Sequence, residues 1–358
     1  MFRKLFSWVA WRIASMIIGL IRWAMRVIKS NPTLYGLAYS LKNSQEFSNL
    51  FEHEKMLADP VRVDTYAQAI QKLVKPGDVV VDLGTGSGVL AMLAARQGAK
   101  VYAIDHSDFI HLAEQNAARN GIEGIRFIQV NSKSFEPPEK ADVLLHEQIG
   151  DNLFNENMVE NLLELKRRIL KPGGRILPGR FHLYMEPVTL KREFRVPFLE
   201  EIKVHGLDFG YLAEAGRHFR AANYDRRWVE RDGVEQYLGE PRPLLTVDLN
   251  EIETADGLPT VVNVVRRVTR PGSLDGIQKY FAVDFDDDLY FDTSPFSPRT
   301  HWTNRLFRVP TRRCEVGDAI AYSVSLSDLL RSNTWKIELL PASAPQAELA
   351  PLQLQEAT

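Results

Sequence analysis

The chain has 358 residues, of which 45% are hydrophobic and 25% charged, so it can bury a substantial core and is long enough for about two domains. Its formal net charge of -2 supplies no global basic field, so nucleic acid is not an expected partner. The single cysteine, Cys314, excludes an internal disulfide framework and is typical of a reducing compartment, which predicts a cytoplasmic protein.

The first 30 residues form a basic segment without any acidic residue, and its basic positions are Arg3, Lys4, Arg12, Arg22, Arg26 and Lys29. On a helix most of these share one face, opposite a row of large apolar side chains. The longest uncharged stretch, residues 13–21, is much shorter than the ~20 residues that span a bilayer. We therefore predict that residues 1–30 form an amphipathic helix on a membrane surface. A helix packed on a partner subunit and an organellar targeting segment are the alternatives.

Residues 31–178 are predicted to form a Rossmann-like α/β domain, because a helical stretch at 44–73 is followed by apolar runs that alternate with amphipathic helices. The expected strands are 79–83, 100–104, 126–130, 142–145 and 175–177, and the expected helices are 89–97, 109–120 and 158–170. The sequence Lys171-Pro-Gly-Gly174 is expected to form a turn after the last helix.

Residues 179–340 change to period-two strands, which predicts an antiparallel, β-barrel-like second domain. The expected strands are 181–188, 244–249, 261–268, 277–285 and 319–326. A polar, helix-favouring segment at about 211–236 interrupts them, and we expect it to be an arm that contacts a second copy in a homodimer. The Ala-, Pro- and Gln-rich tail at 341–358 is predicted to be disordered.

A glycine-rich turn follows the first predicted strand of the α/β domain, with Gly84, Gly86 and Gly88 in it. Glycines at such a turn let a ligand approach the backbone closely. Position 89, where the dinucleotide fingerprint needs its third glycine, is Val89, so the loop departs from nicotinamide enzymes. Asp82 precedes the glycines, and its carboxylate would repel a pyrophosphate but attract the ammonium or sulfonium of S-adenosylmethionine.

Polar residues also follow the next two predicted strands. Asp105 ends the strand at 100–104, where an acid can accept both hydrogen bonds from a ribose diol. Asn131 and Ser132 follow the strand at 126–130 and are expected to meet the edge of the adenine. These positions predict a nucleoside-containing cofactor, and no metal is expected.

Glu147 and Glu156 lie nine positions apart in the loop that follows the predicted strand at 142–145. Open α/β sheets gather their ligands at this end of their strands, so the pair suggests a cation held beside the cofactor. Acidic residues in a loop are more often solvated surface charge, and the pair alone does not decide between the two readings.

Five separated stretches resemble one family. They are His53–Tyr66, Val81–Gly88, Glu147–Glu156, Lys171–Gly174 and Thr293–Trp302. Glycine loops are shared by many methyltransferases, whereas two spaced glutamates followed at a distance by Thr300-His301-Trp302 are far more specific. On these residues the chain resembles the protein arginine N-methyltransferase family over about residues 48–330.

This resemblance implies that the cofactor is S-adenosylmethionine and that the helices at 44–66 fold over it. Arg62 would then pair with the methionine carboxylate of the cofactor, with His53 close by and Met56 between the cofactor and the substrate. A guanidinium can grip a carboxylate with two hydrogen bonds, so the chemistry of this assignment is sound.

The resemblance also implies the reaction, which is methyl transfer to an arginine guanidinium of a protein or peptide. A guanidinium has a pKa above ~12 and is a poor nucleophile, so the site must orient and polarise it. Glu147 and Glu156 would clamp it and aim one nitrogen at the methyl group. His301 together with Asp59 would remove the proton that methylation releases.

The stretch between the two glutamates departs from the family. Family members with protein substrates commonly have Trp-Met-Gly-Tyr there, whereas this chain has Gln148-Ile-Gly-Asp151. Loss of the aromatic rings removes cation–π contacts with an arginine, so a small guanidine-bearing metabolite is an alternative substrate. A membrane-associated, non-catalytic scaffold with the same fold is the second alternative. A nucleic-acid amino-methyltransferase is disfavoured, since no Asn/Asp-Pro-Pro-aromatic turn follows the strand at 142–145.

Overall fold

The computed structural model describes residues 2–31, 34, 49–154, 156–195, 197–198, 202–212, 226–229, 231–329 and 331–341. The chain divides into two compact units, residues 1–54 and residues 55–358. The expected disordered tail beyond Pro341 and the central part of the expected arm, residues 213–225, lie outside the described residues.

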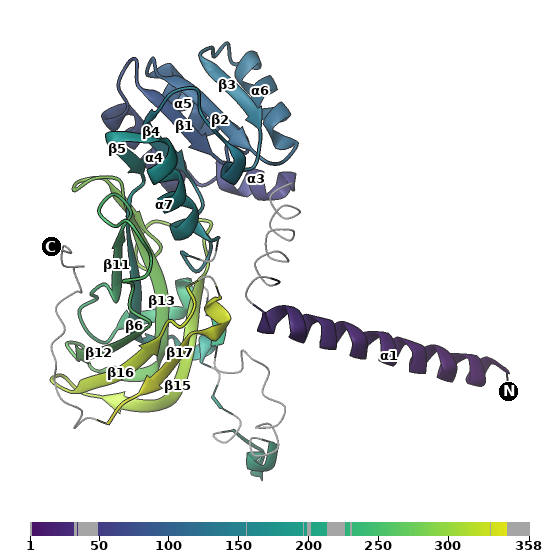
Figure 1. Ribbon diagram of the computed structural model, residues 1–358. Coiled ribbons are helices and arrows are strands. Elements are labelled where there is room, and N and C mark those ends of the chain that lie inside the picture. Colours follow the sequence, from purple (N-terminus) through teal and green to yellow (C-terminus); the bar gives the residue numbers. More distant parts are fainter. Residues whose placement is uncertain are drawn as a thin grey trace. The chain divides into compact units, whose positions relative to one another are not determined.

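A single long helix, α1 (Phe2–Ser30), dominates the first unit and is drawn in purple in Figure 1. Several of its large apolar side chains are in contact with solvent, among them Trp11, Met16 and Trp23, which are each more than 60% exposed. Within the described ranges, no helix combines the length and the apolarity that crossing a membrane requires.

The second unit begins with a five-stranded parallel sheet in the order β3-β2-β1-β4-β5 (Figure 1). Its strands are β1 Val79–Leu83, β2 Lys100–Asp105, β3 Ile125–Gln129, β4 Ala141–His146 and β5 Leu170–Leu177. The helices of this part of the unit are α4 Pro60–Leu73, α5 Val89–Arg96, α6 Phe109–Arg119 and α7 Met158–Ile169, and helix α3, Leu50–Leu57, spans the boundary between the two units in sequence. From β1 the chain continues to β2 and β3 on one side of the sheet and then crosses to β4 and β5 on the other side. The order of the strands therefore reverses beside β1. A crevice at the carboxyl ends of β1 and β4 is the expected ligand site of such a sheet.

The predicted strands and helices of this sheet are confirmed to within a few residues, with one exception at its edge. Lys171–Gly174, expected to be a turn, belongs to strand β5, which starts at Leu170. Between its pairings with Ala141 and Val143 the register of β5 shifts, so an irregularity in the ladder accommodates the Pro-Gly-Gly sequence. The local turn signal was therefore overridden by pairing with β4.

Antiparallel sheets follow, so the predicted change of architecture in the second half of the chain is confirmed. One sheet has seven strands, with β10-β6-β13-β15-β9 as its main path, β11 beside β6 and β14 beside β13, and another has the order β12-β16-β17. The strands are β6 Arg180–Leu190, β7 Lys203–Val204, β8 Leu207–Asp208, β9 Arg226–Val229, β10 Val234–Tyr237, β11 Leu245–Asp248, β12 Val261–Arg267, β13 Gly272–Asp284, β14 Tyr290–Asp292, β15 Asn304–Cys314, β16 Ala319–Ser325 and β17 Lys336–Leu339.

The expected helical arm at 211–236 is wrong for its C-terminal part. Residues 226–229 form β9, which pairs with β15, and residues 234–237 form β10, which pairs with β6. Both partners are distant in sequence, and long-range strand pairing of this kind outweighs local propensity.

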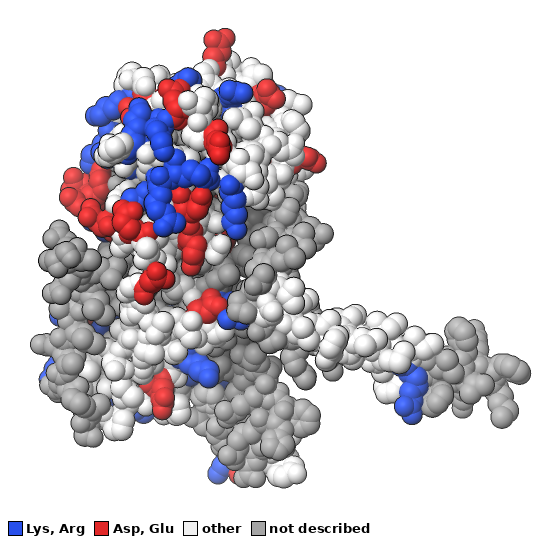
Figure 2. Space-filling model, in the orientation of Figure 1, with Lys and Arg blue, Asp and Glu red and all other residues white. Residues whose placement is uncertain are grey.

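Charged side chains of both signs are interspersed on the face of the molecule shown in Figure 2. Ion pairs between charged side chains of the structure include Lys171 with Asp142 at 2.7 Å and Arg168 with Glu164 at 2.7 Å. Below the surface, one apolar cluster contains residues of the parallel sheet and of the antiparallel sheets, including Leu144, Phe281 and Trp302. The parallel sheet and the antiparallel sheets therefore share one hydrophobic core.

Candidate functional site

The glycine loop after β1 has the backbone geometry that only glycine adopts readily. Gly84, Gly86 and Gly88 have φ values of 68°, 50° and 83°. A Cβ at Gly88 would lie 3.0 Å from the Cβ of Ala113, so this glycine allows α5 and α6 to approach. A Cβ at Gly84 would meet nothing within 4 Å, so at this position the backbone is open to a ligand.

Asp82 shapes the glycine loop as well as charging it. It is 1% exposed, and its Oδ2 accepts hydrogen bonds from Thr85 Oγ1 at 2.6 Å and from the backbone N–H of Ala91 at 3.1 Å. Burial raises the pKa of Asp82 to about 6, although both hydrogen bonds oppose this shift. The sequence indicated the charge of Asp82 but not its second role, which is to satisfy an N–H in the first turn of α5.

Asp105 connects the end of β2 to the same loop. Its Oδ2 accepts the N–H of Gly86 at 3.1 Å, and its Oδ1 accepts the N–H and the hydroxyl of Ser107 at 2.8 and 2.7 Å. Asn131 and Ser132 follow β3, next to β2, and the side chain of Asn131 accepts the N–H of Lys133 at 3.0 Å. Asp82, Asp105 and Asn131 thus lie at or just beyond the carboxyl ends of the neighbouring strands β1, β2 and β3.

Arg62, on α4, lies against one of the two expected clamp residues. Its Nη2 donates to Glu147 Oε2 at 2.7 Å, and its Nη1 donates to the carbonyl of Met56 at 3.0 Å. Burial lowers the pKa of Arg62, but the surrounding groups, foremost the Glu147 carboxylate, together raise the pKa above its ordinary value. The Nε of Arg62 is buried and has no hydrogen-bond partner among the described residues. No local pattern in the sequence predicts the contact between Arg62 and Glu147. His53 is buried on α3.

His146, the last residue of β4, anchors the start of the glutamate loop, residues 147–156. Its Nε2 lies 2.9 Å from the carbonyl of Pro178, and its Nδ1 accepts the N–H of Gln148 at 3.3 Å. A carbonyl only accepts, so the proton of the neutral ring is on Nε2. Burial lowers the pKa of His146 to about 4, which keeps the ring neutral. His146 was not among the predicted site residues, and its only signal in the sequence is its position directly before Glu147.

The glutamate loop is tethered by residues of the antiparallel part of the chain. Trp302 Nε1 donates to the carbonyl of Ile149 at 2.7 Å, and the N–H of Thr303 donates to Asp151 Oδ1 at 3.1 Å. Lys279 Nζ donates to the carbonyl of Asp151. Glu147 is 10% exposed at its side chain and Glu156, at the other end of the loop, is partly buried. The middle of the loop between the two glutamates is therefore held by β13 and by the segment before β15.

Asp59 and His301 form a buried pair although they are 242 positions apart. Asp59 Oδ2 accepts from His301 Nδ1 and from the backbone N–H of His301, both at 2.8 Å, and Asp59 Oδ1 accepts the N–H of Arg62 at 3.1 Å as the N-cap of α4. Burial raises the pKa of Asp59, but these hydrogen bonds outweigh burial and the pKa lies below its ordinary value. An ionised Asp59 places the ring proton on Nδ1, so Nε2 of His301 carries the free lone pair.

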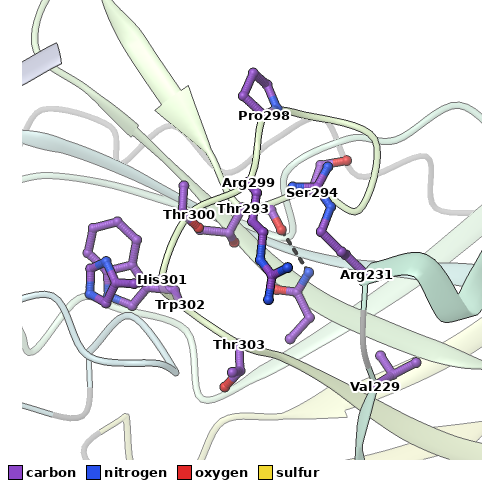
Figure 3. Close-up of a pocket in the computed structure, with 11 residues that line it drawn as sticks. Val229, Arg231, Thr293, Ser294, Pro298, Arg299, Thr300, His301, Trp302 and Thr303 are labelled. Atoms are coloured by element: carbon purple, nitrogen blue, oxygen red, sulfur yellow. Dashed lines mark hydrogen bonds between the residues drawn. The ribbon is translucent and has the colours of Figure 1, made fainter. Parts of the chain in front are cut away.

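A small pocket lies beside His301 and is lined by the segment 293–304, with Val229 and Arg231 (Figure 3). Its volume is about 80 Å³, well below the ~300 Å³ at which ligand pockets begin, so it is too small for a nucleoside cofactor. Figure 3 shows Arg299 extending between Thr293 and Thr303. His301 and Trp302 lie side by side on the left of this view. The pocket therefore gives the region next to His301 a polar wall with two arginines.

Known proteins resemble this chain over most of its length. A family model described as a methyltransferase domain matches residues 74–208, and one described as an arginine methyltransferase oligomerization subdomain matches residues 223–338. Protein arginine N-methyltransferase 6 from Danio rerio is 34% identical over 266 residues, which are 72% of this chain and 75% of the relative.

Solved structures resemble the fold. Protein arginine methyltransferase 10 from Arabidopsis thaliana, described as a uniquely open conformation, superposes with a TM-score of 0.67 at 25% identity, over 79% of this chain and 89% of that chain. The PRMT1 enzyme–prozyme heterotetrameric complex with AdoHcy from Trypanosoma brucei gives a TM-score of 0.65 at 24% identity, over 78% of this chain and 88% of that chain.

Proposed function

The chain belongs to the protein arginine N-methyltransferase family and is an S-adenosylmethionine-dependent methyltransferase, and from this premise we propose that it methylates an arginine guanidinium of a protein or peptide. In this proposal Glu147 and Glu156 hold the guanidinium, and His301 with Asp59 accepts the proton that methylation releases.

The contact between Arg62 and Glu147 carries the proposal. Glu147 Oε2 binds a guanidinium nitrogen at 2.7 Å in a site where both side chains are at most 10% exposed. A carboxylate buried to this degree interacts strongly with a guanidinium, since little water screens the charges. Glu147 is therefore already in an environment in which it binds the chemical group of the proposed substrate.

Charge balance explains why two glutamates are needed. Arg62 neutralises one of them, and both reactants, a guanidinium and a sulfonium, are cations. A single further carboxylate would leave the approach of two cations unfavourable, whereas Glu147, Glu156, Asp59 and Asp82 together give the site an excess of negative charge. We therefore assign the two glutamates to orienting the guanidinium and to polarising it toward the nitrogens they bind.

Gln148 adds a third acceptor between the glutamates. Its Oε1 is buried and accepts no hydrogen bond from the described residues. The guanidinium of an arginine has five N–H donors, and two carboxylates that each accept two of them leave one N–H group over. Gln148 can accept this N–H group, in place of the aromatic contacts expected in the family. This feature suits an arginine in a protein and also a small guanidine-bearing metabolite, which stays the alternative substrate.

The tautomer of His301 suits it to accept the proton that methylation releases. The methylated nitrogen must lose one proton, and the lone pair on His301 Nε2 can accept it while Asp59 stabilises the resulting imidazolium. Asp59 also holds the backbone N–H of His301, so the same carboxylate fixes both the position and the tautomer of the ring.

The residues at the ends of β1, β2 and β3 fit S-adenosylmethionine, which supplies the methyl group. Gly84 leaves room for a ligand against the backbone, and the buried Nε of Arg62 is without an acceptor among the described residues. We assign Arg62 to the carboxylate of the cofactor, Asp82 to its positive charges and Asp105 to its ribose. Met56, Asn131 and Ser132 complete the proposed set, whereas the assignment of His53 rests on the family resemblance alone.

The test is methyl transfer from labelled S-adenosylmethionine to arginine-rich peptides and, separately, to small guanidine compounds. We expect label in the peptide arginine, and Glu147→Gln and Glu156→Gln should each lower turnover by roughly 100-fold or more while cofactor affinity changes little. Label only in small compounds would favour the metabolite alternative. Near-normal turnover in either variant would rule out the clamp, and cofactor binding without any acceptor would favour the scaffold.

We further propose a homodimer and a membrane-bound α1. The match of residues 223–338 to an oligomerization subdomain supports self-association, and a monomeric mass by light scattering would contradict it. The exposed Trp11, Met16 and Trp23 of α1, in a segment with basic but no acidic residues, support contact with anionic lipid. Removing residues 1–30 should abolish flotation with anionic liposomes, and flotation that is unchanged would exclude this role.

A further inference from the structure

Lys279 is an unusual residue for the middle of a sheet. It lies on β13, its side chain is fully buried, and its Nζ is 5.4 Å from the centre of the Phe281 ring. Directly opposite on β15 is Arg305, which also carries a positive charge. Like charges opposite each other in a sheet are unfavourable, and the hydrogen bond of Lys279 goes to a backbone carbonyl rather than to a carboxylate.

Burial of this lysine costs stability. Burial lowers the pKa of Lys279 to about 7; the charge of Asp151 opposes this shift and that of Arg305 adds to it. A methionine would fill nearly the same space without a charge or an unmatched N–H group. Replacing buried charged residues by apolar ones of similar volume is often neutral or stabilising. The lysine therefore has a disadvantage that must be offset elsewhere.

The hydrogen bond of Lys279 indicates which part of the protein benefits from this buried lysine. Its Nζ donates to the backbone carbonyl of Asp151, in the middle of the glutamate loop and 128 positions away in sequence. The carbonyl of Ile149, two residues earlier, is held by Trp302, and two residues later Leu153 has a φ of 70°, which is unusual for a residue with a side chain. The loop between the two glutamates thus has a strained backbone that is held from outside.

We propose that Lys279 is a positioning residue for methyl transfer, which holds the carbonyl of Asp151 and thereby sets the separation and direction of Glu147 and Glu156. Lys279 touches neither reactant; it acts through the loop. The inference rests on the proposed function of the two glutamates. It also links Lys279 to the altered sequence Gln148–Asp151, because the tether attaches within that stretch.

The test compares Lys279→Met with Gln278→Met. Gln278 is the adjacent residue of β13, points to the other face of the sheet, is fully buried, and has no partner for its amide among the described residues. Both variants remove a costly buried polar group, so both should unfold at a higher temperature than the unchanged protein. Only Lys279→Met should speed hydrogen exchange in residues 147–156. Only Lys279→Met should lower turnover, by roughly 10- to 100-fold, with cofactor affinity within about threefold.

The pH dependence of stability gives a second readout. The pKa of Lys279 in the folded protein, about 7, lies below its ordinary value of 10.5, so the destabilisation is complete below pH 7 and disappears as the pH rises toward 10.5. The stability advantage of Lys279→Met should therefore shrink over this range, whereas that of Gln278→Met should stay constant.

The inference fails if Lys279→Met is less stable than the unchanged protein or does not fold, because the lysine is then an ordinary structural residue. It also fails if exchange in residues 147–156 is unchanged or if turnover stays within twofold. The stability and exchange measurements need no substrate. An unchanged protein that methylates no arginine, with faster loop exchange in Lys279→Met, would reject the proposed function while leaving the tether intact.

Discussion

Replacing Asp59 by asparagine tests the proton route, because this one carboxylate has two separable functions. Its Oδ1 caps α4 through the N–H of Arg62, and its Oδ2 accepts both the backbone N–H and Nδ1 of His301. In Asp59→Asn the remaining carbonyl oxygen can still cap the helix, but an NH₂ group then faces the N–H of His301. The amide can satisfy the ring only by donating to Nδ1, which places the ring proton on Nε2.

The size of the effect follows from these contacts. Two hydrogen bonds to a charged acceptor that is 4% exposed are lost, and one buried N–H is left facing a donor, so we expect a loss of about 3 kcal/mol in the free energy of unfolding. For a chain of 358 residues the melting temperature should fall by roughly 4–5 °C. Turnover should fall by about 10²- to 10⁴-fold, the usual contribution of a positioned general base, because Nε2 no longer offers a lone pair.

The assay combines thermal unfolding with turnover at saturating cofactor and peptide. His301→Gln is the matched variant, since it retains the backbone N–H bonded to Asp59 and should lose less stability but a similar amount of turnover. The double variant should be no slower than the slower single variant, because both substitutions disable one proton path. Turnover of Asp59→Asn within twofold of the unchanged protein would refute this role of the pair, as would multiplicative effects in the double variant.

Two further predictions concern pH. The pKa of His146 is about 4 in the folded protein and 6.5 ordinarily, so its contribution of about 3 kcal/mol to stability should be complete above pH 6.5 and be lost as the pH falls toward 4. Urea unfolding between pH 4 and pH 7 measures this loss, and His146→Gln should show a weaker acid dependence; an equal dependence would mean that other groups cause it. The pKa of Asp82 is about 6, so its carboxylate becomes protonated below that pH and S-adenosylmethionine should then bind more weakly. Calorimetric titrations from pH 5 to pH 8 should show this change in the unchanged protein and not in Asp82→Asn, and a parallel decline in both would remove Asp82 from the cofactor site.

Hydrophobic periodicity located most of the sheet positions correctly. The first strand, residues 79–83, was predicted with its observed bounds, since a strand buried on both faces is a continuous apolar run that local sequence reveals. The predictions failed in regions where pairing with a distant strand decides the structure. β9 is only four residues long and exists as the neighbour of β15, and β5 continues through Pro-Gly-Gly because β4 provides its ladder.

The sequence by itself determined the chemistry of the site, because residue types and their spacing along one strand–loop–helix unit are local properties. The glycine turn, the acid at the end of β2 and the two glutamates of one loop could all be read without a structure. Tertiary structure alone decided which groups meet. Arg62 and Glu147 are 85 positions apart, Lys279 and Asp151 are 128 apart, and Asp59 and His301 are 242 apart. No local pattern encodes such pairs, since packing of the two sheets on one core brings them together. The two glutamates are thus a feature of the sequence, and the way they are held is a feature of the fold.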